Sequence, residues 1–229
     1  MNALDCRTAQ HHHVFSMDDI DGEVTDHGVV LDVQDVPWAG RQMWDTDVAH
    51  KNGKYYLYFP VKDKTDIFRI GVAVSDKPEG PFVPEKHPIT GSYSIDPAVL
   101  EAEDGQHYMY FGGLWGGQLQ RYRNNKAQEC GSEPADDEPS LPARVVKMSD
   151  DLLEFSEEPK SLVILDENGE PLKAGDHDRR FFEASWMHKY NGKYYFSYST
   201  GNSHLLCYAV GDSPYGPFTY KGVILTPVV

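Results

Sequence analysis

The chain contains the stretch Asn52-Gly53-Lys54-Tyr55-Tyr56-Leu57-Tyr58, and the pattern returns as Asn191-Gly192-Lys193-Tyr194-Tyr195-Phe196-Ser197-Tyr198. A looser copy lies between them, at Asp104-Gly105-Gln106-His107-Tyr108-Met109-Tyr110. Each copy places a polar turn before a run of aromatic residues, which is typical of a turn that leads into a β-strand. Internal repeats of this size, built from short strands and turns, predict the blades of a β-propeller.

A second module follows each copy and supplies the other half of a blade. It is Ala73-Val74-Ser75-Asp76-Lys77-Pro78-Glu79-Gly80-Pro81-Phe82 in one place and Ala209-Val210-Gly211-Asp212-Ser213-Pro214-Tyr215-Gly216-Pro217-Phe218 in another. A degenerate version runs from Lys147 to Phe155. The chain opens inside such a module, because residues 13–31 match its strand, turn and strand with no aromatic half before them.

The phase of the repeat predicts one all-β domain over residues 1–229 that holds half a blade and then three full blades. The partial blade covers residues 1–35, and the full blades cover residues 43–90, 93–163 and 181–227. An incomplete propeller exposes strand edges and apolar faces, since a propeller closes by packing its blades into a ring. The alternative is a short, self-sufficient β-sandwich.

Composition limits the partners. The net charge of −15 argues against nucleic acid, whose phosphates require a basic surface, and suits a soluble protein with a neutral ligand. No apolar run is long enough to span a bilayer, so no membrane partner is expected. The first 20 residues contain no stretch of signal-peptide length, which favours the cytoplasm for the N-terminus as given. The oligomeric state stays open.

The cysteines and a histidine run carry no metal-site pattern. Cys6, Cys130 and Cys207 are odd in number and have no metal-like spacing. The run His11-His12-His13 is interpreted as the entry to a strand. We therefore predict no metal site from these residues.

Two carboxylates stand in apolar or aromatic surroundings where inner blade strands begin. Asp96 follows Tyr93-Ser94-Ile95, and Glu183 lies between Phe181-Phe182 and Ala184-Ser185-Trp186. A buried carboxylate is costly unless it is paired or used, and apolar surroundings favour its protonated form. A general acid needs such a raised pKa. The alternative is a pair of structural carboxylates that cap turns or bind backbone amides.

These residues resemble glycoside hydrolase family 43. The similarity extends from Val14 to Pro227 and is carried by Arg41-Gln42-Met43-Trp44-Asp45-Thr46-Asp47, Ile95-Asp96-Pro97-Ala98, Phe182-Glu183-Ala184 and the paired Gly-Pro-Phe turns. The resemblance implies a five-bladed β-propeller, incomplete here at about three and a half blades. It also implies hydrolysis of xylose- or arabinose-containing oligosaccharides by single displacement with inversion, as in β-xylosidases and α-L-arabinofuranosidases.

The family uses three carboxylates on separate blades, and the resemblance assigns two of them here. Glu183 corresponds to the general acid, and Asp96 to the aspartate that tunes the pKa of the acid and orients it. The general base belongs to the first half of the first blade, which is missing from the chain. Asp45 is a substitute base to consider, Asp47 matches a structural aspartate, and Asp5 lies outside the family's Asp-Pro context.

The resemblance implies no organic cofactor. A central calcium or other cation belongs to the complete family fold, and the fifth blade supplies the histidine that holds it. We therefore expect the chain, with no base of its own, to be a weak hydrolase at most. The runner-up interpretation is a non-catalytic carbohydrate-binding propeller, and a third is a protein-interaction propeller.

Three apolar residues are candidates for contact with a sugar. Flat aromatic rings bury the apolar face of a pyranose, which favours Trp44 at a blade start and Trp115 within Gly112-Gly113-Leu114-Trp115-Gly116-Gly117. Ile95, before Asp96, is expected to form an apolar wall. Trp38 and Trp186 are assigned to packing between blades. The long loops at 123–143 and 166–180 break the repeat and are expected to line the site.

Overall fold

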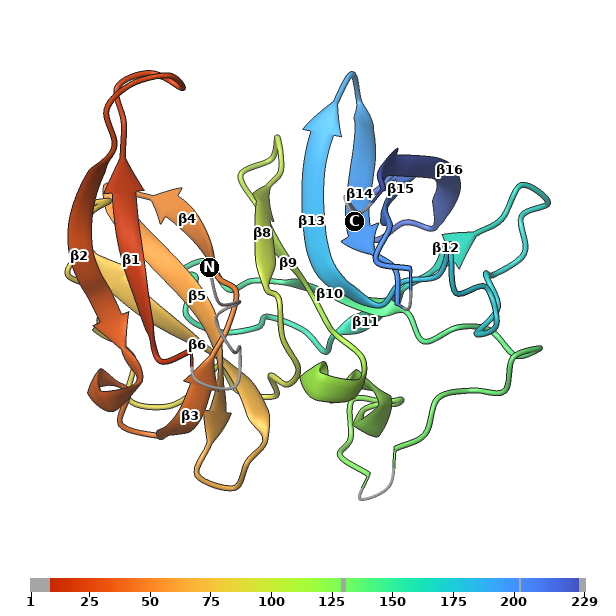
Figure 1. Ribbon diagram of the computed structural model, residues 1–229, viewed down its shortest axis with the longest axis horizontal. Helices are drawn as coiled ribbons and strands as arrows, with labels where there is room; N and C mark the ends of the chain where they lie inside the picture. Colours follow the sequence, from red (N-terminus) through yellow and green to blue (C-terminus); the bar gives the residue numbers. More distant parts are fainter. Residues whose placement is uncertain (1–8, 129–130, 202, 227–229) are drawn as a thin grey trace.

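The computed structural model describes residues 9–128, 131–201 and 203–226, and within them the chain is built from strands and short 3-10 turns. Asp5, Cys6 and Cys130 lie outside the described residues. Four sheets follow one another along the chain and lie side by side across the molecule (Figure 1). Their arrangement confirms the all-β prediction and the partial five-bladed propeller.

The strands fall into four sheets in chain order. The first sheet contains β1 (His11–Ser16) and β2 (Thr25–Asp32), and the second contains β3 (Ala39–Met43), β4 (Asp47–Lys51), β5 (Lys54–Asp63), β6 (Phe68–Ser75) and β7 (Val83–Pro84). The third contains β8 (Ala98–Glu101), β9 (His107–Phe111), β10 (Ala143–Lys147) and β11 (Lys160–Leu162). The fourth contains β13 (Glu183–Tyr190), β14 (Lys193–Ser199), β15 (Leu206–Gly211), β16 (Phe218–Leu225) and β12 (Ile164–Leu165), which pairs parallel to β16.

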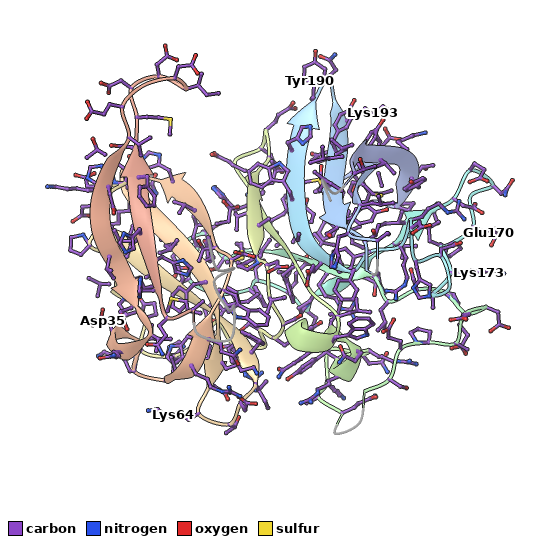
Figure 2. The ribbon with its side chains drawn as sticks, in the orientation of Figure 1. Asp35, Lys64, Glu170, Lys173, Tyr190 and Lys193 are labelled. Carbon is purple, nitrogen blue, oxygen red and sulfur yellow. The ribbon has the colours of Figure 1, made fainter. Side chains whose placement is uncertain are left out.

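The repeated stretch forms the same local structure each time. In its two close copies the Asn-Gly pairs both adopt left-handed φ angles, 53° and 76° at Asn52 and Gly53, and 47° and 74° at Asn191 and Gly192. Such a pair forms the tight turn whose twist matches that of a hairpin. The aromatic strand after the turn then pairs antiparallel with the strand of the second module, as β5 does with β6 and β14 with β15. Tyr190 and Lys193 flank the turn at the tip of the hairpin that β13 and β14 form (Figure 2).

The last tyrosine of each copy joins its sheet to a neighbouring segment. Tyr58, Tyr110 and Tyr198 are fully buried. The Tyr58 hydroxyl donates to the Leu152 carbonyl at 2.9 Å, and the Tyr110 hydroxyl donates to the Pro214 carbonyl at 3.0 Å. Because a buried hydroxyl needs a partner, the repeat places both an apolar ring and a specific hydrogen bond between adjacent sheets.

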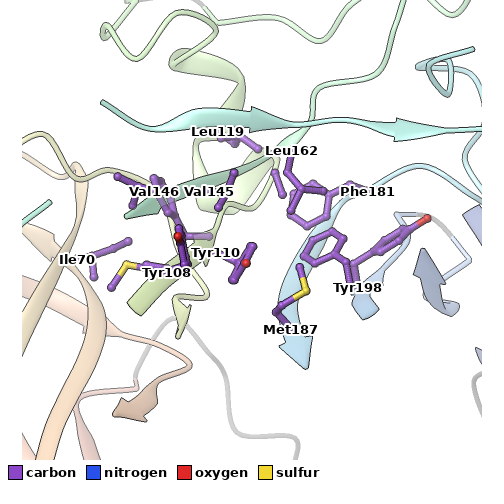
Figure 3. Packing of buried hydrophobic residues seen from close by; sticks show 14 of the residues in the cluster. Ile70, Tyr108, Tyr110, Leu119, Val145, Val146, Leu162, Phe181, Met187 and Tyr198 are labelled. Carbon is purple, nitrogen blue, oxygen red and sulfur yellow. The ribbon is translucent and has the colours of Figure 1, made fainter. Parts of the chain in front are cut away.

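The main core lies between the second, third and fourth sheets. Figure 3 shows Tyr108, Tyr110 and Val145 of the third sheet on one side and Met187 and Tyr198 of the fourth on the other. A second cluster fastens the β1–β2 sheet to the second sheet through Leu31 and Phe59, among others. The inner strands β4, β8 and β13 are thereby held at fixed positions relative to one another.

The sheet boundaries differ from the predicted blades in two places. β3 begins before residue 43 and pairs with the second half of β5, on the same side of β5 as β4. β12 lies between the predicted blades and adds a parallel strand to β16. Both are short edge strands without the aromatic pattern on which the prediction rested. In the described part of the chain, no helix has the length and apolar character needed to cross a membrane.

Candidate active site

The starts of three inner strands meet around one cavity. Its volume is about 280 Å³, and its lining comes from the segments before and at the starts of β4, β8 and β13. The residues that line it are Asp45, Thr46, Asp47, Asp96, Pro97, Ala98, Ala184, Ser185 and Trp186. Segments far apart in the sequence thus contribute acidic, apolar and aromatic groups to one space.

Asp96 lines this cavity and lies near Glu183, which precedes the lining residue Ala184 and is not itself part of the lining. Asp96 lies two residues before β8 and is 8% exposed, whereas Glu183 is the first residue of β13 and is half-buried. The Asp96 Oδ2 atom accepts a hydrogen bond of 2.8 Å from the backbone N–H of Ala184, the residue after Glu183. This bond ties the two inner strands together at the two carboxylates that the sequence singled out.

Burial dominates the ionisation of both groups. It raises the pKa of Asp96 to about 7, against the Ala184 hydrogen bond and with help from the negative charges of Glu183 and Asp45. It also raises the pKa of Glu183, opposed by His204 and reinforced by Asp45. Both carboxyls therefore hold protons more tightly than an exposed carboxyl does, which is the property that general acid catalysis needs.

A glycine-rich loop fixes the residues just before the two carboxylates. The Gly112 N–H donates to the Ile95 carbonyl at 2.8 Å, and the Leu114 N–H donates to the Phe182 carbonyl at 3.0 Å. A Cβ on Gly113 would lie 2.6 Å from Ile95 Cδ1 and 3.4 Å from Glu183 Cβ. Only glycine allows this approach. The loop therefore sets the spacing between the segment before β8 and the start of β13.

Several backbone conformations near the carboxylates are unfavourable. Ser94, Asp96, Trp115 and Ala184 have φ angles of 65°, 54°, 48° and 60°. Residues other than glycine keep a left-handed φ angle only where surrounding contacts fix their conformation. Such residues cluster at functional sites. Here Ser94 provides part of that hold, because its hydroxyl donates to the Gly117 carbonyl at 2.6 Å.

The predicted sugar-contact residues meet on the same loop, but they differ in access. Trp115 is 54% exposed, and the ring of Trp44 lies against Gly116, at 3.4 Å from the position of a Cβ there. Ile95 is 2% exposed and packs under Gly113 and Gly117. Ile95 therefore supports the loop and leaves little surface for a ligand to touch, because the close backbone approach covers its side chain.

The two other aspartates at the start of β4 have different surroundings. Asp47 accepts backbone hydrogen bonds from Val99 at 2.7 Å and Val48 at 2.8 Å, although burial raises its pKa. It therefore links β4 to β8, as expected of a structural aspartate. Asp45 is exposed and lies close enough to raise the pKa of both Asp96 and Glu183.

Two residues near the site were misjudged or passed over at the sequence level. Trp186 was assigned to packing between blades, but it is 54% exposed and lines the cavity. A bulge between Glu183 and Trp186 shifts the register of β13, and alternation along the strand does not reveal it. His204, for which no function was predicted, lies near enough to favour the ionised form of Glu183.

The described residues do not form a cation site by themselves. No three His, Cys, Asp or Glu side chains among residues 9–128, 131–201 and 203–226 converge as metal ligands. Asp47 and Asp96 instead accept hydrogen bonds from backbone amides.

Two buried carboxylates at the starts of neighbouring inner strands fit the acid chemistry of a glycoside hydrolase, and comparison with known proteins gives the family. Residues 14–136 match the family model described as glycosyl hydrolases family 43. The chain is 70% identical to a xylosidase/arabinosidase of Bacteroides ovatus over 219 residues, which are 95% of this chain and 67% of that protein. The chain belongs to glycosyl hydrolase family 43.

Two solved structures are similar throughout. A GH43_1 enzyme from Xanthomonas citri complexed with xylose superposes with a TM-score of 0.96 at 56% identity, covering 99% of this chain and 69% of that one. CoXyl43, a GH43 β-xylosidase/α-arabinofuranosidase from a compost metagenome in complex with xylotriose, gives 0.93 at 62% identity, covering 96% and 68%. The predictions of the family and of glycosidase function are confirmed.

Proposed function

We propose that the protein cleaves xylose- or arabinose-containing oligosaccharides with inversion, using Glu183 as the general acid and Asp96 as the residue that orients it. The single observation that carries this proposal is the hydrogen bond of Asp96 to the Ala184 amide, which holds a buried carboxylate beside Glu183. The named activities of the relatives, xylosidase and arabinosidase, support the substrate class.

In this mechanism Glu183 donates its proton to the leaving glycosidic oxygen. Burial and the charge of Asp45 both raise the pKa of Glu183, so this carboxyl holds its proton to a higher pH than an exposed glutamate does. Asp96 fixes the backbone at Ala184 and therefore the direction in which the Glu183 side chain leaves β13. An inverting glycosidase also needs a base that activates water, at roughly 6.5–9.5 Å from the acid.

The sugar ring would rest against Trp186 in the cavity lining and against the tryptophans at the glycine-rich loop. Trp115 and Trp186 each expose more than half of their surface, and Trp44 lies beside the same glycine loop. Aromatic faces bury the apolar side of a sugar ring and leave its hydroxyls to polar groups. The xylose and xylotriose bound by two related structures favour a xylose-containing oligosaccharide as the first substrate to test.

Product analysis tests the proposal. The protein for this test is a graft in which this chain replaces the matching 219 residues of the Bacteroides ovatus relative. We expect the graft to release xylose from aryl β-D-xylosides, and NMR of the first product should show the α-anomer before mutarotation, because a single displacement inverts the centre. The ungrafted relative is the control. First release of the β-anomer, or no release at all, would contradict the proposal.

A further inference from the structure

The side chain of Trp115 is tied to a buried arginine through one carboxylate. The indole Nε1 of Trp115 donates to Oε1 of Glu133, and Arg180 Nη2 donates to Oε2 of the same residue at 2.9 Å. Glu133 therefore uses both oxygens, one for each partner. The three residues come from three segments, the glycine-rich loop and the two long loops that interrupt the repeat.

Arg180 holds the carboxylate of Glu133 in place. Its side chain is 3% exposed, and that of Glu133 is 25% exposed. A buried guanidinium needs a counter-charge, and a hydrogen-bonded ion pair between charged partners is stronger and more directional than a neutral hydrogen bond. Glu133 is the carboxylate that pairs with Arg180 in the described part of the chain. The position of Glu133 is therefore set by a group that has little freedom to move.

The backbone around Glu133 is held as well. The loop at 131–142 pairs with the loop at 172–175 through the bonds Ser140 N–H to Leu172 O at 2.8 Å and Ala174 N–H to Glu138 O at 2.9 Å. Arg123 Nε donates to the Ser132 carbonyl at 3.1 Å, one residue before Glu133. The two long loops thus support each other and carry the carboxylate between them.

The ring of Trp115 contacts the residue that directly precedes Glu183. Its indole meets the ring of Phe182 edge to face, with centroids 5.1 Å apart and planes at 84°. Phe182 directly precedes Glu183. The contact with Phe182 therefore sets the angle of the Trp115 ring relative to the strand that carries the general acid. An exposed ring that contacts Phe182 and whose N–H is fixed has few orientations left.

We infer that Glu133 and Arg180 are positioning residues that fix the Trp115 ring as a platform for the oligosaccharide beside Glu183. The inference rests on the proposed function and adds to it the residues that orient a ring for sugar contact. A sugar that stacks on Trp115 gains from a ring whose angle is set before binding, because less conformational freedom is then lost. Removing the carboxylate should loosen the ring and weaken the binding of an oligosaccharide.

The test uses the 229-residue chain, xylotriose as the probe, and two readouts. The first is acrylamide quenching of Trp115, taken as the difference between each protein and its Trp115→Phe counterpart. The second is the dissociation constant for xylotriose by calorimetry. Glu133→Ala should raise the quenching of Trp115 and weaken xylotriose binding about tenfold, close to the effect of Trp115→Ala. Glu133→Gln keeps an acceptor for the indole but loses the charge opposite Arg180, and should fall between Glu133→Ala and the parent.

The matched control is Glu167→Ala, which removes an exposed carboxylate from the neighbouring loop where it pairs with Arg179. It should leave both readouts unchanged. Parental quenching in Glu133→Ala would overturn the inference. If the parent itself does not bind xylotriose, the platform role of Trp115 fails, and the quenching comparison still decides whether Glu133 fixes the ring; product analysis of the graft decides the proposed function separately.

Discussion

Glu183→Gln in the graft should reduce hydrolysis of xylobiose about 10²–10⁴-fold. The physical reason is that the sugar alkoxide is a poor leaving group that must be protonated as the bond breaks. A dinitrophenyl xyloside needs little protonation, so its hydrolysis should fall less than about tenfold. The measurement is kcat/KM for both substrates, and its result is the ratio of the two losses.

The control for this comparison is an exposed glutamate on the long loop. Glu170→Gln should leave both rates unchanged, since Glu170 lies on the outer loop (Figure 2) and is not among the residues that line the cavity. Equal losses on the two substrates in Glu183→Gln would argue that Glu183 positions the substrate and does not protonate the leaving oxygen.

The second large effect concerns the 229-residue chain by itself. We expect it to hydrolyse aryl xylosides and arabinofuranosides about 10²–10⁴-fold more slowly than the graft, which is the usual contribution of a general base. The family resemblance places that base on the first half of the first blade, and no described residue corresponds to that half, because the sheet of β1 and β2 is the first. The measurement is turnover of both proteins at equal concentration.

Asp45→Asn tests whether Asp45 serves as the general base in place of the missing one. Asp45 is exposed and acts on the pKa of both Asp96 and Glu183, so it is the described carboxylate best placed to replace a base. Comparable turnover of the chain and the graft, abolished by Asp45→Asn, would show that Asp45 is the base. Xylotriose binding without turnover in both the chain and the graft would fit the carbohydrate-binding alternative.

The local features of the fold were predictable because they depend on short stretches of sequence. The Asn-Gly pairs at 52–53 and 191–192 favour left-handed backbone, and the aromatic residues that follow favour strands, so turn and hairpin are set together. Asp96 and Glu183 could be placed beside each other because each begins a copy of the same repeat. Edge strands such as β12 carry no comparable pattern and depend on a partner that the sequence does not reveal.

The parts of the site that could not be predicted depend on contacts over long distances in the sequence. Ile95 is covered because a glycine loop from the following hairpin approaches within contact distance. Trp186 faces the cavity because β13 is bulged, which alternation of residue types cannot show. The partnership of Glu133 with Arg180 joins residues 47 positions apart in two irregular loops, for which no periodic signal exists.

The coupling of Asp96 and Glu183 is tested most directly by a carboxyl titration of this chain, labelled with ¹³C at aspartate and glutamate and followed by NMR. Asp96 should titrate with a pKa of about 7, well above its ordinary value of 3.8, and Glu183 should also titrate above its ordinary value. In Glu183→Gln the Asp96 pKa should fall, because the negative charge that helps to raise it is gone. An Asp96 carboxyl that titrates near 3.8 in the parent, with no change in Glu183→Gln, would contradict the account.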